Sequence, residues 1–177
     1  MKITDIRSML DSGNVACPLC GADAEVIQRS PGSFFIGLRC PNCLSYYLKG
    51  SVFDTFDDAE HLYLFSGYLR HFWSEDNVFQ CFDSNEISRI IQEEQKIEND
   101  NRKMAFMIFY YAQMIECFDD WCSFEPFPAI AYCNGTEELT KIAQMAAEKG
   151  FVKLNDDLSQ INITRSGVEF SKLERKK

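Results

Sequence analysis

The sequence lacks the segments that would place it in a membrane and the short motifs of the common enzyme classes. No uncharged apolar run is long enough to span a bilayer, and Met1–Arg7 contains no apolar stretch typical of a secretory signal peptide. No Gly-x-Ser-x-Gly, His-Glu-x-x-His, phosphate-binding loop or dinucleotide fingerprint occurs. We therefore expect a cytoplasmic protein that is not an enzyme and has no membrane association.

Histidine is scarce, since the chain contains only His61 and His71. They are ten positions apart, which is not the i,i+4 spacing that places two metal ligands on one helix face. Carboxylates are abundant, but pairs such as Glu93-Glu94 and Asp119-Asp120 are better explained as solvated helix faces than as a Mg²⁺ site. An enzyme whose active site has no recognisable sequence motif remains an alternative.

An excess of basic residues is also missing. The chain has 18 Lys and Arg against 27 Asp and Glu, for a net charge of −9. Residues 51–135 alone carry a net charge of −11, whereas residues 1–50 and 136–177 each carry +1. Proteins that bind DNA through its phosphates usually present a basic face. We therefore expect weak binding to generic duplex DNA at physiological salt.

Cysteine, in contrast, occurs eight times, and four of the cysteines form two paired motifs. Cys17-Pro-Leu-Cys20 and Cys40-Pro-Asn-Cys43 are separated by 19 residues. Each Cys-x-x-Cys turn directs two thiolates at one ion, and two such turns complete a closed tetrahedral shell. We predict one structural Zn²⁺ ion at these four cysteines. Redox motifs or disulfides are the alternative, but thioredoxin-like motifs lie near a βαβ pattern, which is missing here.

The residues around the two cysteine pairs favour a β-hairpin. Three short segments are predicted to be strands: residues 24–28, 34–39 and 45–48. Residues 30–33, Ser-Pro-Gly-Ser, form a turn signal between the first two strands, and the return strand brings Cys40 beside Cys20. This layout is typical of a zinc ribbon, which we assign to residues 1–50.

The other four cysteines show no metal-binding pattern. They are Cys81, Cys117, Cys122 and Cys133. Free cysteine is common in protein cores, where it behaves as a small apolar residue. A second metal site that combines some of these cysteines with a histidine is the alternative, although the spacing does not require one.

The middle of the chain, residues 51–135, is predicted to be helical. Apolar residues at helical spacing indicate helices over about 57–73, from 83 onward, and over 102–118. The third of these is apolar around most of its girth, from Met104 to Phe118, so we expect it to be the central helix of the core. We predict that Ile108 and Met114 are both buried there.

The last 42 residues, 136–177, resemble the end of a winged-helix domain. The pattern predicts a helix, two strands over 151–154 and 160–163, and a final short helix. The phrases Lys-Gly-Phe-Val at 149–152 and Ile-Thr-Arg-Ser-Gly at 163–167 stand where that family has a helix-ending glycine and a Leu-Thr-x-x-Gly stretch. Phosphate contacts in such a unit would come from Lys141, Lys153 and Arg165.

Taken as a whole, the chain is similar to a set of poorly characterised bacterial proteins. These have an N-terminal four-cysteine ribbon, a helix with a phrase like Ser66-Gly67-Tyr68-Leu69-Arg70, and a winged-helix-like end. The resemblance implies an architecture rather than an activity, and some such modules resemble components of bacterial defence islands. We therefore expect an α+β protein that acts as a protein-interaction or regulatory module, binding a protein partner or its own copy. A nucleic-acid-binding transcriptional regulator is the alternative.

Overall fold

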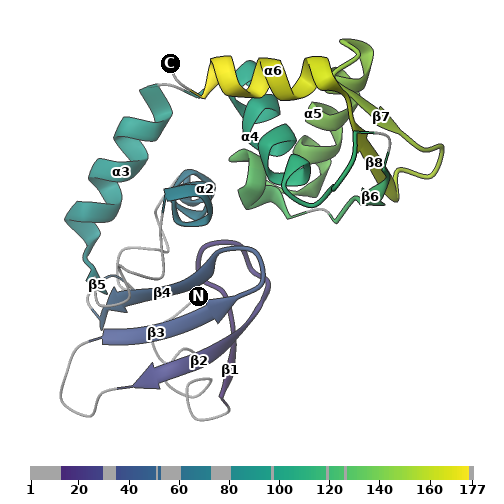
Figure 1. The fold of residues 1–177 in the computed structure, drawn as a ribbon. Helices are drawn as coiled ribbons and strands as arrows, with labels where there is room; N and C mark the ends of the chain where they lie inside the picture. Colours follow the sequence, from purple (N-terminus) through teal and green to yellow (C-terminus); the bar gives the residue numbers. More distant parts are fainter. Residues whose placement is uncertain are drawn as a thin grey trace. The chain divides into compact units, whose positions relative to one another are not determined.

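The chain folds into mixed α and β structure that divides into two compact units, residues 1–96 and 97–177 (Figure 1). The computed structural model describes residues 13–29, 35–50, 52, 61–72, 81–96, 98–118, 120–125 and 127–175. The boundary between the units falls inside the expected helical middle, because its first two helices belong with the N-terminal sheet and the third belongs with the C-terminal elements. No helix in these described ranges combines the length and the apolar character needed to cross a bilayer.

The N-terminal unit is built on a five-stranded sheet of order β1-β2-β3-β4-β5. The strands are β1 (Asn14–Ala16), β2 (Asp23–Arg29), β3 (Phe35–Cys40), β4 (Leu44–Lys49) and β5 (Cys81–Phe82). The first four strands pair antiparallel in sequence order, whereas β5 joins β4 in parallel. The three strands expected from the sequence are therefore present, and the turn expected at residues 30–33 lies outside the described residues.

Within its described residues, the N-terminal unit also contains two helices, α2 (Leu62–Phe72) and α3 (Ser84–Lys96). Residues 57–60 and 73, where the sequence also predicts the first helix, lie outside the described residues. A reciprocal pair of hydrogen bonds fixes the start of α3, because Asp83 N–H donates to the Glu86 carboxylate and Glu86 N–H donates to the Asp83 carboxylate, each at 2.9 Å. Phe65 and Leu69 of α2 and Ile87 and Ile90 of α3 are buried in one core with the sheet.

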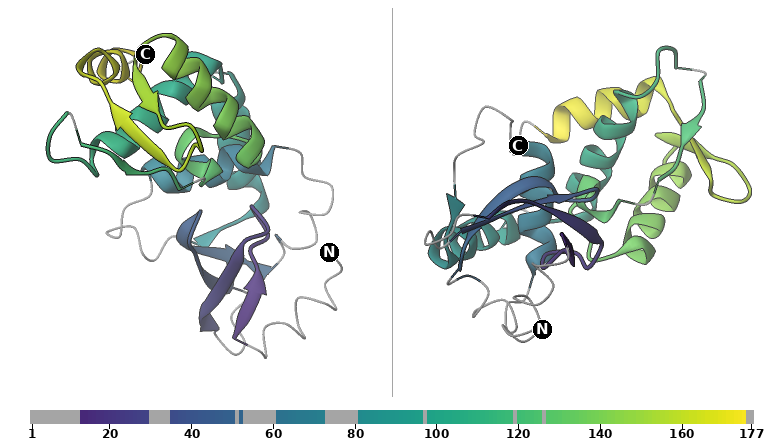
Figure 2. Two further views of the ribbon diagram at one scale, coloured as in Figure 1. Left: turned by 90° about the vertical axis from the view of Figure 1, so that its right-hand side faces the viewer. Right: turned by 90° about the horizontal axis from the view of Figure 1, so that it is seen from below.

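The C-terminal unit packs three helices with a small sheet. Its elements are α4 (Asp100–Ala112), β6 (Cys122–Ser123), the 3₁₀ helix η4 (Pro128–Ala131), α5 (Thr136–Glu148), β7 (Val152–Leu154), β8 (Gln160–Ile163) and α6 (Arg165–Glu174). The strands pair antiparallel in the order β6-β8-β7. Helix α6 lies along α4, which the views of Figures 1 and 2 show from different sides.

Helix α4 is the most deeply buried helix of this unit, but it is shorter than the sequence predicts. Met104, Met107, Ile108 and Tyr111 are fully buried, as expected for a central helix. The prediction that the helix continues to Phe118 is wrong, because it ends at Ala112 and the Gln113 N–H bonds back to the carbonyls of Tyr110 and Tyr111. The prediction that Met114 is buried is also wrong, since 51% of that residue is exposed.

Hydrogen bonds of Thr164, within the 163–167 segment, connect the start of α6 to the residues that follow α5. The Thr164 hydroxyl donates to the Gly150 and Phe151 carbonyls and accepts the Gly167 N–H, which caps α6. Position 167 also requires glycine, because a Cβ there would collide with the Phe151 carbonyl. Gly150 has φ of +72°, the left-handed conformation that glycine adopts readily after a helix.

A buried ion cluster fixes the start of α4. Lys103 is 5% exposed, and its Nζ lies 2.6 Å from carboxylate oxygens of both Glu98 and Glu138. Burial opposes the charge on Lys103, but the hydrogen bonds to these two carboxylates outweigh it and raise the pKa of the lysine. The Glu138 carboxylate also accepts the Asn134 N–H, so the cluster links α4 to the start of α5.

Candidate metal centre

The structure brings Cys17, Cys20, Cys40 and Cys43 together in the N-terminal unit. The first two cysteines lie in the turn between β1 and β2, Cys40 ends β3, and Cys43 immediately precedes β4. Their sulfur atoms all lie within 4.8 Å of one another. The β2–β3 hairpin delivers the two turns to the same place, because β2 starts just after Cys20 and β3 runs back antiparallel to it. The expected grouping of these four cysteines is therefore confirmed.

The sulfur spacing fits a four-thiolate metal site. The Sγ atoms of Cys17 and Cys43 are 3.7 Å apart, and those of Cys20 and Cys40 are 3.5 Å apart. Tetrahedral zinc with bonds of about 2.3 Å to sulfur would place the sulfurs about 3.8 Å apart, whereas a disulfide requires about 2.05 Å. Four thiolates suit zinc and also iron, so this geometry defines the donor set rather than the ion.

Each cysteine turn contains a residue in the left-handed conformation directly after its second cysteine. Gly21 has φ of +74° in the first turn, and Leu44 has φ of +65° at the equivalent place in the second. The first turn is closed by hydrogen bonds from Gly21 N–H to the Cys17 carbonyl and from Cys17 N–H to the Ala22 carbonyl. The two turns therefore both place a left-handed residue after the second cysteine, but only the first has glycine there.

Two hydroxyl groups, one on a strand and one on a helix, contact the cysteine sulfurs. The Tyr46 hydroxyl of β4 lies 3.0 Å from Cys17 Sγ, and the Ser66 hydroxyl of α2 lies 2.9 Å from Cys43 Sγ. Burial raises the pKa of Tyr46 well above its ordinary value, so its phenol keeps the proton that it can donate. Hydrogen bonds of this kind stabilise thiolate charge in metal sites and orient the ligands.

Arg70 adds a third contact between α2 and the centre. Its guanidinium donates to the Pro41 carbonyl at 2.9 Å and, more weakly, to the Asn42 carbonyl at 3.4 Å. Ser66 and Arg70 are four positions apart, so they lie on the same face of α2 and both reach the second cysteine turn. The sequence pattern places Ser66 and Arg70 only within a resemblance and predicts no contact between them and the cysteines. Their i,i+4 spacing, which places both on one helix face, could have indicated a shared role.

The four sulfurs differ in burial and in pKa. Cys17, Cys40 and Cys43 are buried, whereas Cys20 is exposed. Hydrogen bonding among the sulfurs raises the pKa values of Cys17 and Cys43 and lowers those of Cys20 and Cys40. Four sulfurs this close repel one another when all are ionised, and a bound dication relieves that repulsion. The donor chemistry therefore fits a metal ion.

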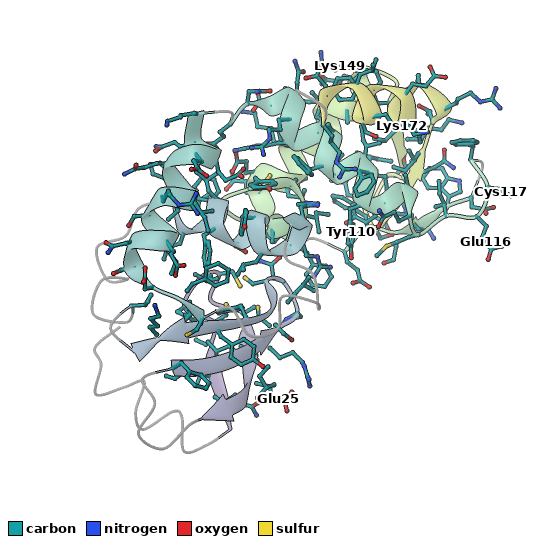
Figure 3. The ribbon with its side chains drawn as sticks, turned by 60° about the vertical axis from the view of Figure 1, so that its left-hand side comes forward. Glu25, Tyr110, Glu116, Cys117, Lys149 and Lys172 are labelled. Atoms are coloured by element: carbon teal, nitrogen blue, oxygen red, sulfur yellow. The ribbon has the colours of Figure 1, made fainter. Side chains whose placement is uncertain are left out.

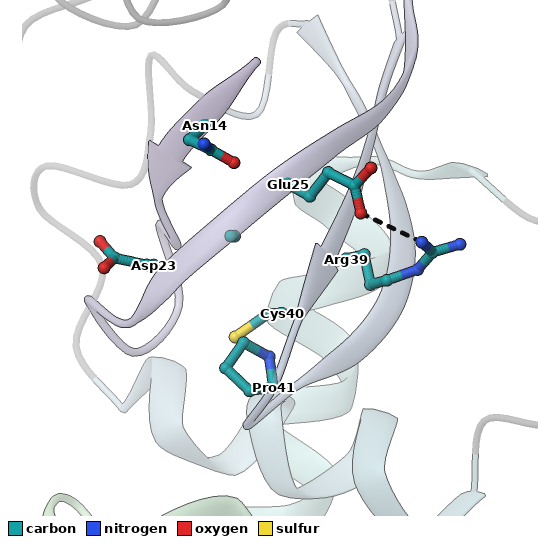
Figure 4. Close-up of a pocket in the computed structure, with 7 residues that line it drawn as sticks. Asn14, Asp23, Glu25, Arg39, Cys40 and Pro41 are labelled. Atoms are coloured by element: carbon teal, nitrogen blue, oxygen red, sulfur yellow. Dashed lines mark hydrogen bonds and ion pairs between the residues drawn. The ribbon is translucent and has the colours of Figure 1, made fainter. Parts of the chain in front are cut away.

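A shallow pocket lies beside the centre on the sheet. Its volume is about 530 Å³, and it is lined by Asn14, Asp23, Ala24, Glu25, Arg39, Cys40 and Pro41 (Figure 4). Glu25 and Arg39 form an exposed ion pair at 3.0 Å along its wall. Exposed pairs of this kind contribute little stability. The lining holds no histidine and no nucleophile paired with a base, so the pocket offers no recognisable catalytic set.

The remaining cysteines do not join a metal cluster. Within the parts of the chain that the structure describes, the only grouping of three or more candidate ligands is the four-cysteine set. Cys133 is buried, and burial raises the pKa of its thiol to about 12, so it stays protonated and inert. Cys117 is exposed on the loop after α4. The alternative of a second metal site gains no support from these positions.

The three candidate nucleic-acid contacts lie on different elements of the C-terminal unit. Lys141 is on α5, Lys153 is on β7 and Arg165 begins α6, and all three are exposed. The turn between β7 and β8 carries Asp156 and Asp157, and the Asp157 carboxylate accepts both the Ser159 N–H and the Ser159 hydroxyl. The hairpin therefore presents acidic groups where contact with DNA phosphates would favour basic ones.

Comparison of the chain with models of protein families, with curated proteins and with solved structures gave no match. The resemblance drawn from the sequence therefore stays a prediction.

Proposed function

We propose that the N-terminal unit is a zinc ribbon that binds one structural Zn²⁺ ion through Cys17, Cys20, Cys40 and Cys43. The observation that carries this proposal is the set of four sulfurs that lie within 4.8 Å of one another, with two pairs at 3.7 and 3.5 Å. Four protein ligands fill the coordination shell of zinc and leave no position for water or substrate, so the role is structural. When bound, the ion supplies the cross-link that ties the β1–β2 turn to the β3–β4 turn.

We further propose that the chain is a non-enzymatic protein-interaction or regulatory module of the cytoplasm, with a winged-helix-like C-terminal unit. The order helix, strand, strand, helix from α5 to α6 supports this description, as does the Thr164–Gly167 cap. The acidic net charge of −9 favours protein partners over phosphate backbones. A bacterial regulatory or defence system is the setting that the resemblance suggests.

A nucleic-acid-binding transcriptional regulator is the second candidate. Exposed Lys141, Lys153 and Arg165 on the winged-helix-like unit favour it. The acidic turn at Asp156 and Asp157 opposes it, because a wing that enters a DNA groove meets phosphates on both sides.

Two measurements on one preparation test these proposals. Elemental analysis of protein purified without chelators should find one zinc per chain; protein without any metal would refute the metal site, and another metal in stoichiometric amount would refute zinc as its ion. Fluorescence anisotropy with random duplex DNA should show only weak binding at physiological salt. Sub-micromolar affinity that falls steeply with salt, and that Lys141→Ala or Lys153→Ala reduces, would instead establish the regulator.

A further inference from the structure

The segment between α4 and β6, residues 113–121, exposes a concentration of large apolar side chains. Met114 is 51% exposed, and Phe118 and Trp121 are each 45% exposed. Only Leu44 and Leu173 are comparable elsewhere in the described residues. Exposed apolar groups are ordinary when scattered singly, but a concentration of them marks a binding surface. We call this segment the 113–121 loop.

Long-range hydrogen bonds tie the 113–121 loop to β8. Asn162 on β8 is 2% exposed, and its side-chain amide donates to the Phe118 carbonyl at 3.0 Å and to the Asp120 carbonyl at 2.7 Å. The Asp120 carboxylate also accepts the Cys117 N–H at 3.0 Å. The two hydrogen bonds from this buried amide therefore restrain the loop backbone at Phe118 and Asp120. A surface ordered in advance loses less entropy when a partner binds.

The 113–121 loop and the residues that directly follow it are acidic in sequence. Residues 113–125 contain Glu116, Asp119, Asp120 and Glu125 and no Lys or Arg. Figure 3 shows Glu116 and Cys117 together on the loop that follows α4. One cation also lies against this surface, since the Arg165 guanidinium is 5.7 Å from the centre of the Phe118 ring. The loop therefore combines apolar anchors with an acidic surround.

We propose that the 113–121 loop is the docking surface for a basic amphipathic segment of a protein partner. Apolar side chains of that segment would pack on Phe118 and Trp121, which are the residue types that dominate binding energy at interfaces. Its Lys or Arg residues would face Glu116 and Asp120 and guide the approach. This inference rests on the protein-interaction function proposed above. Single-stranded nucleic acid also stacks on exposed aromatic rings, but the acidic surround repels its phosphates.

The test uses the full chain and three labelled probes in fluorescence anisotropy. The probes are a helical peptide of Leu and Lys, the same peptide with Glu in place of Lys, and single-stranded oligo-dT. We expect the Lys peptide to bind at least about tenfold more tightly than the Glu peptide, with an affinity that falls with salt. Equal binding of the two peptides would overturn the proposal, and preferential binding of oligo-dT would replace it with a nucleic-acid site.

Variants locate the binding. The double variant Phe118→Ser with Trp121→Ser should weaken binding of the Lys peptide by about 30-fold or more, as expected for the loss of two aromatic anchors. Glu116→Lys should weaken it by about three- to tenfold. Leu173→Ser on α6, which removes an apolar side chain that is 66% exposed, is the matched control and should stay within about twofold of wild type.

An unchanged affinity in the double variant would show that the peptide binds elsewhere and would refute the docking surface. Zinc content and duplex-DNA binding, measured on the same preparations, separate this failure from a failure of the proposed function. A protein that holds zinc and ignores duplex DNA, yet binds no basic peptide, loses only the docking proposal.

Discussion

The two units of this chain hold their cores together by different means. In the N-terminal unit, three of the four clustered cysteines are themselves buried core residues beside Leu38 and Tyr46. In the C-terminal unit, the core is built mainly from aliphatic and aromatic side chains around α4, and a buried ion cluster lies at the start of that helix. The proposed zinc site would make the fold of the first unit depend on a bound metal and on reduced thiols, whereas the second unit relies on side-chain packing and the ion cluster at Lys103.

The largest difference between the two units should appear when one of the four clustered cysteines is replaced. Cys43→Ser should lose the metal and the cooperative unfolding transition of the N-terminal unit, since structural zinc contributes on the order of 10 kcal/mol to folding. The C-terminal unit should keep its own transition. Elemental analysis and thermal melts by circular dichroism measure both effects. Cys81→Ser, at a half-buried cysteine of β5 in the same unit, is the control and should retain the metal.

Shortening a buried side chain of α4 should instead destabilise the C-terminal unit. Ile108→Ala should lower the free energy of unfolding of the C-terminal unit by about 2–5 kcal/mol, because the side chain is fully buried. Met114→Ala should cost less than about 0.5 kcal/mol, since Met114 lies beyond the helix and is half exposed. Urea denaturation compares the two variants. Equal effects would mean that α4 extends past Ala112 in solution.

The ion cluster at Lys103 should make the C-terminal unit sensitive to acid through Glu138. Burial opposes the charge on Glu138, but the hydrogen bonds from Lys103 and from the Asn134 N–H outweigh it and lower its pKa below the ordinary 4.5. Because the folded pKa is lowered, the stabilisation is present above about pH 4.5 and is lost as the pH falls through the folded pKa.

Lys103→Met should therefore lower stability at pH 7 by about 1.5–3 kcal/mol and flatten the loss of stability in acid. Unfolding in urea at several pH values measures this slope. Lys149→Met, at an exposed lysine, is the control and should leave the slope unchanged.

The contact between Ser66 of α2 and Cys43 should strengthen metal binding. Ser66→Ala removes the hydroxyl that lies 2.9 Å from the sulfur, so we expect about tenfold weaker zinc binding in competition with a chelator. Ser45→Ala, at a half-buried serine of β4, should leave the affinity unchanged. If both variants bind zinc like wild type, α2 packs beside the centre without supporting it.

The smallest expected effects concern the two cysteine turns. Leu44→Gly should raise the stability of the N-terminal unit by up to about 1 kcal/mol, because it relieves a left-handed leucine. Gly21→Ala should lower it by about 1 kcal/mol, and no neighbouring atom crowds that position, so the cost is conformational. Thermal melts of the metal-bound protein measure both. Changes of the same sign in both variants would show that the two turns differ in shape.

The sequence could predict features whose causes are local. Cys-x-x-Cys spacing predicted the grouping of four sulfurs, because ligand geometry is set within each turn. The strands of the hairpin and the elements from α5 to α6 followed from periodicity and from turn residues such as Gly150.

Features that depend on contacts between residues far apart in the sequence could not be predicted from local patterns. The apolar pattern from Met104 to Phe118 is continuous, yet its last part lies on a surface loop whose backbone is fixed by Asn162, more than 40 positions away. A periodic pattern does not distinguish side chains that face a core from those that face a partner. The contacts of Ser66 and Arg70 with the second cysteine turn likewise span more than 20 positions.

Hydrogen exchange followed by mass spectrometry, on the full chain with and without a zinc chelator, tests the central claim most directly. The claim is that a metal ion holds the N-terminal unit together while the C-terminal unit folds without one. Chelation should abolish the protection of amides in β2, β3 and β4 and leave the protection of α4 and α5 unchanged. Protection of β2 to β4 that survives removal of the metal, or its loss together with that of α4, would contradict the account.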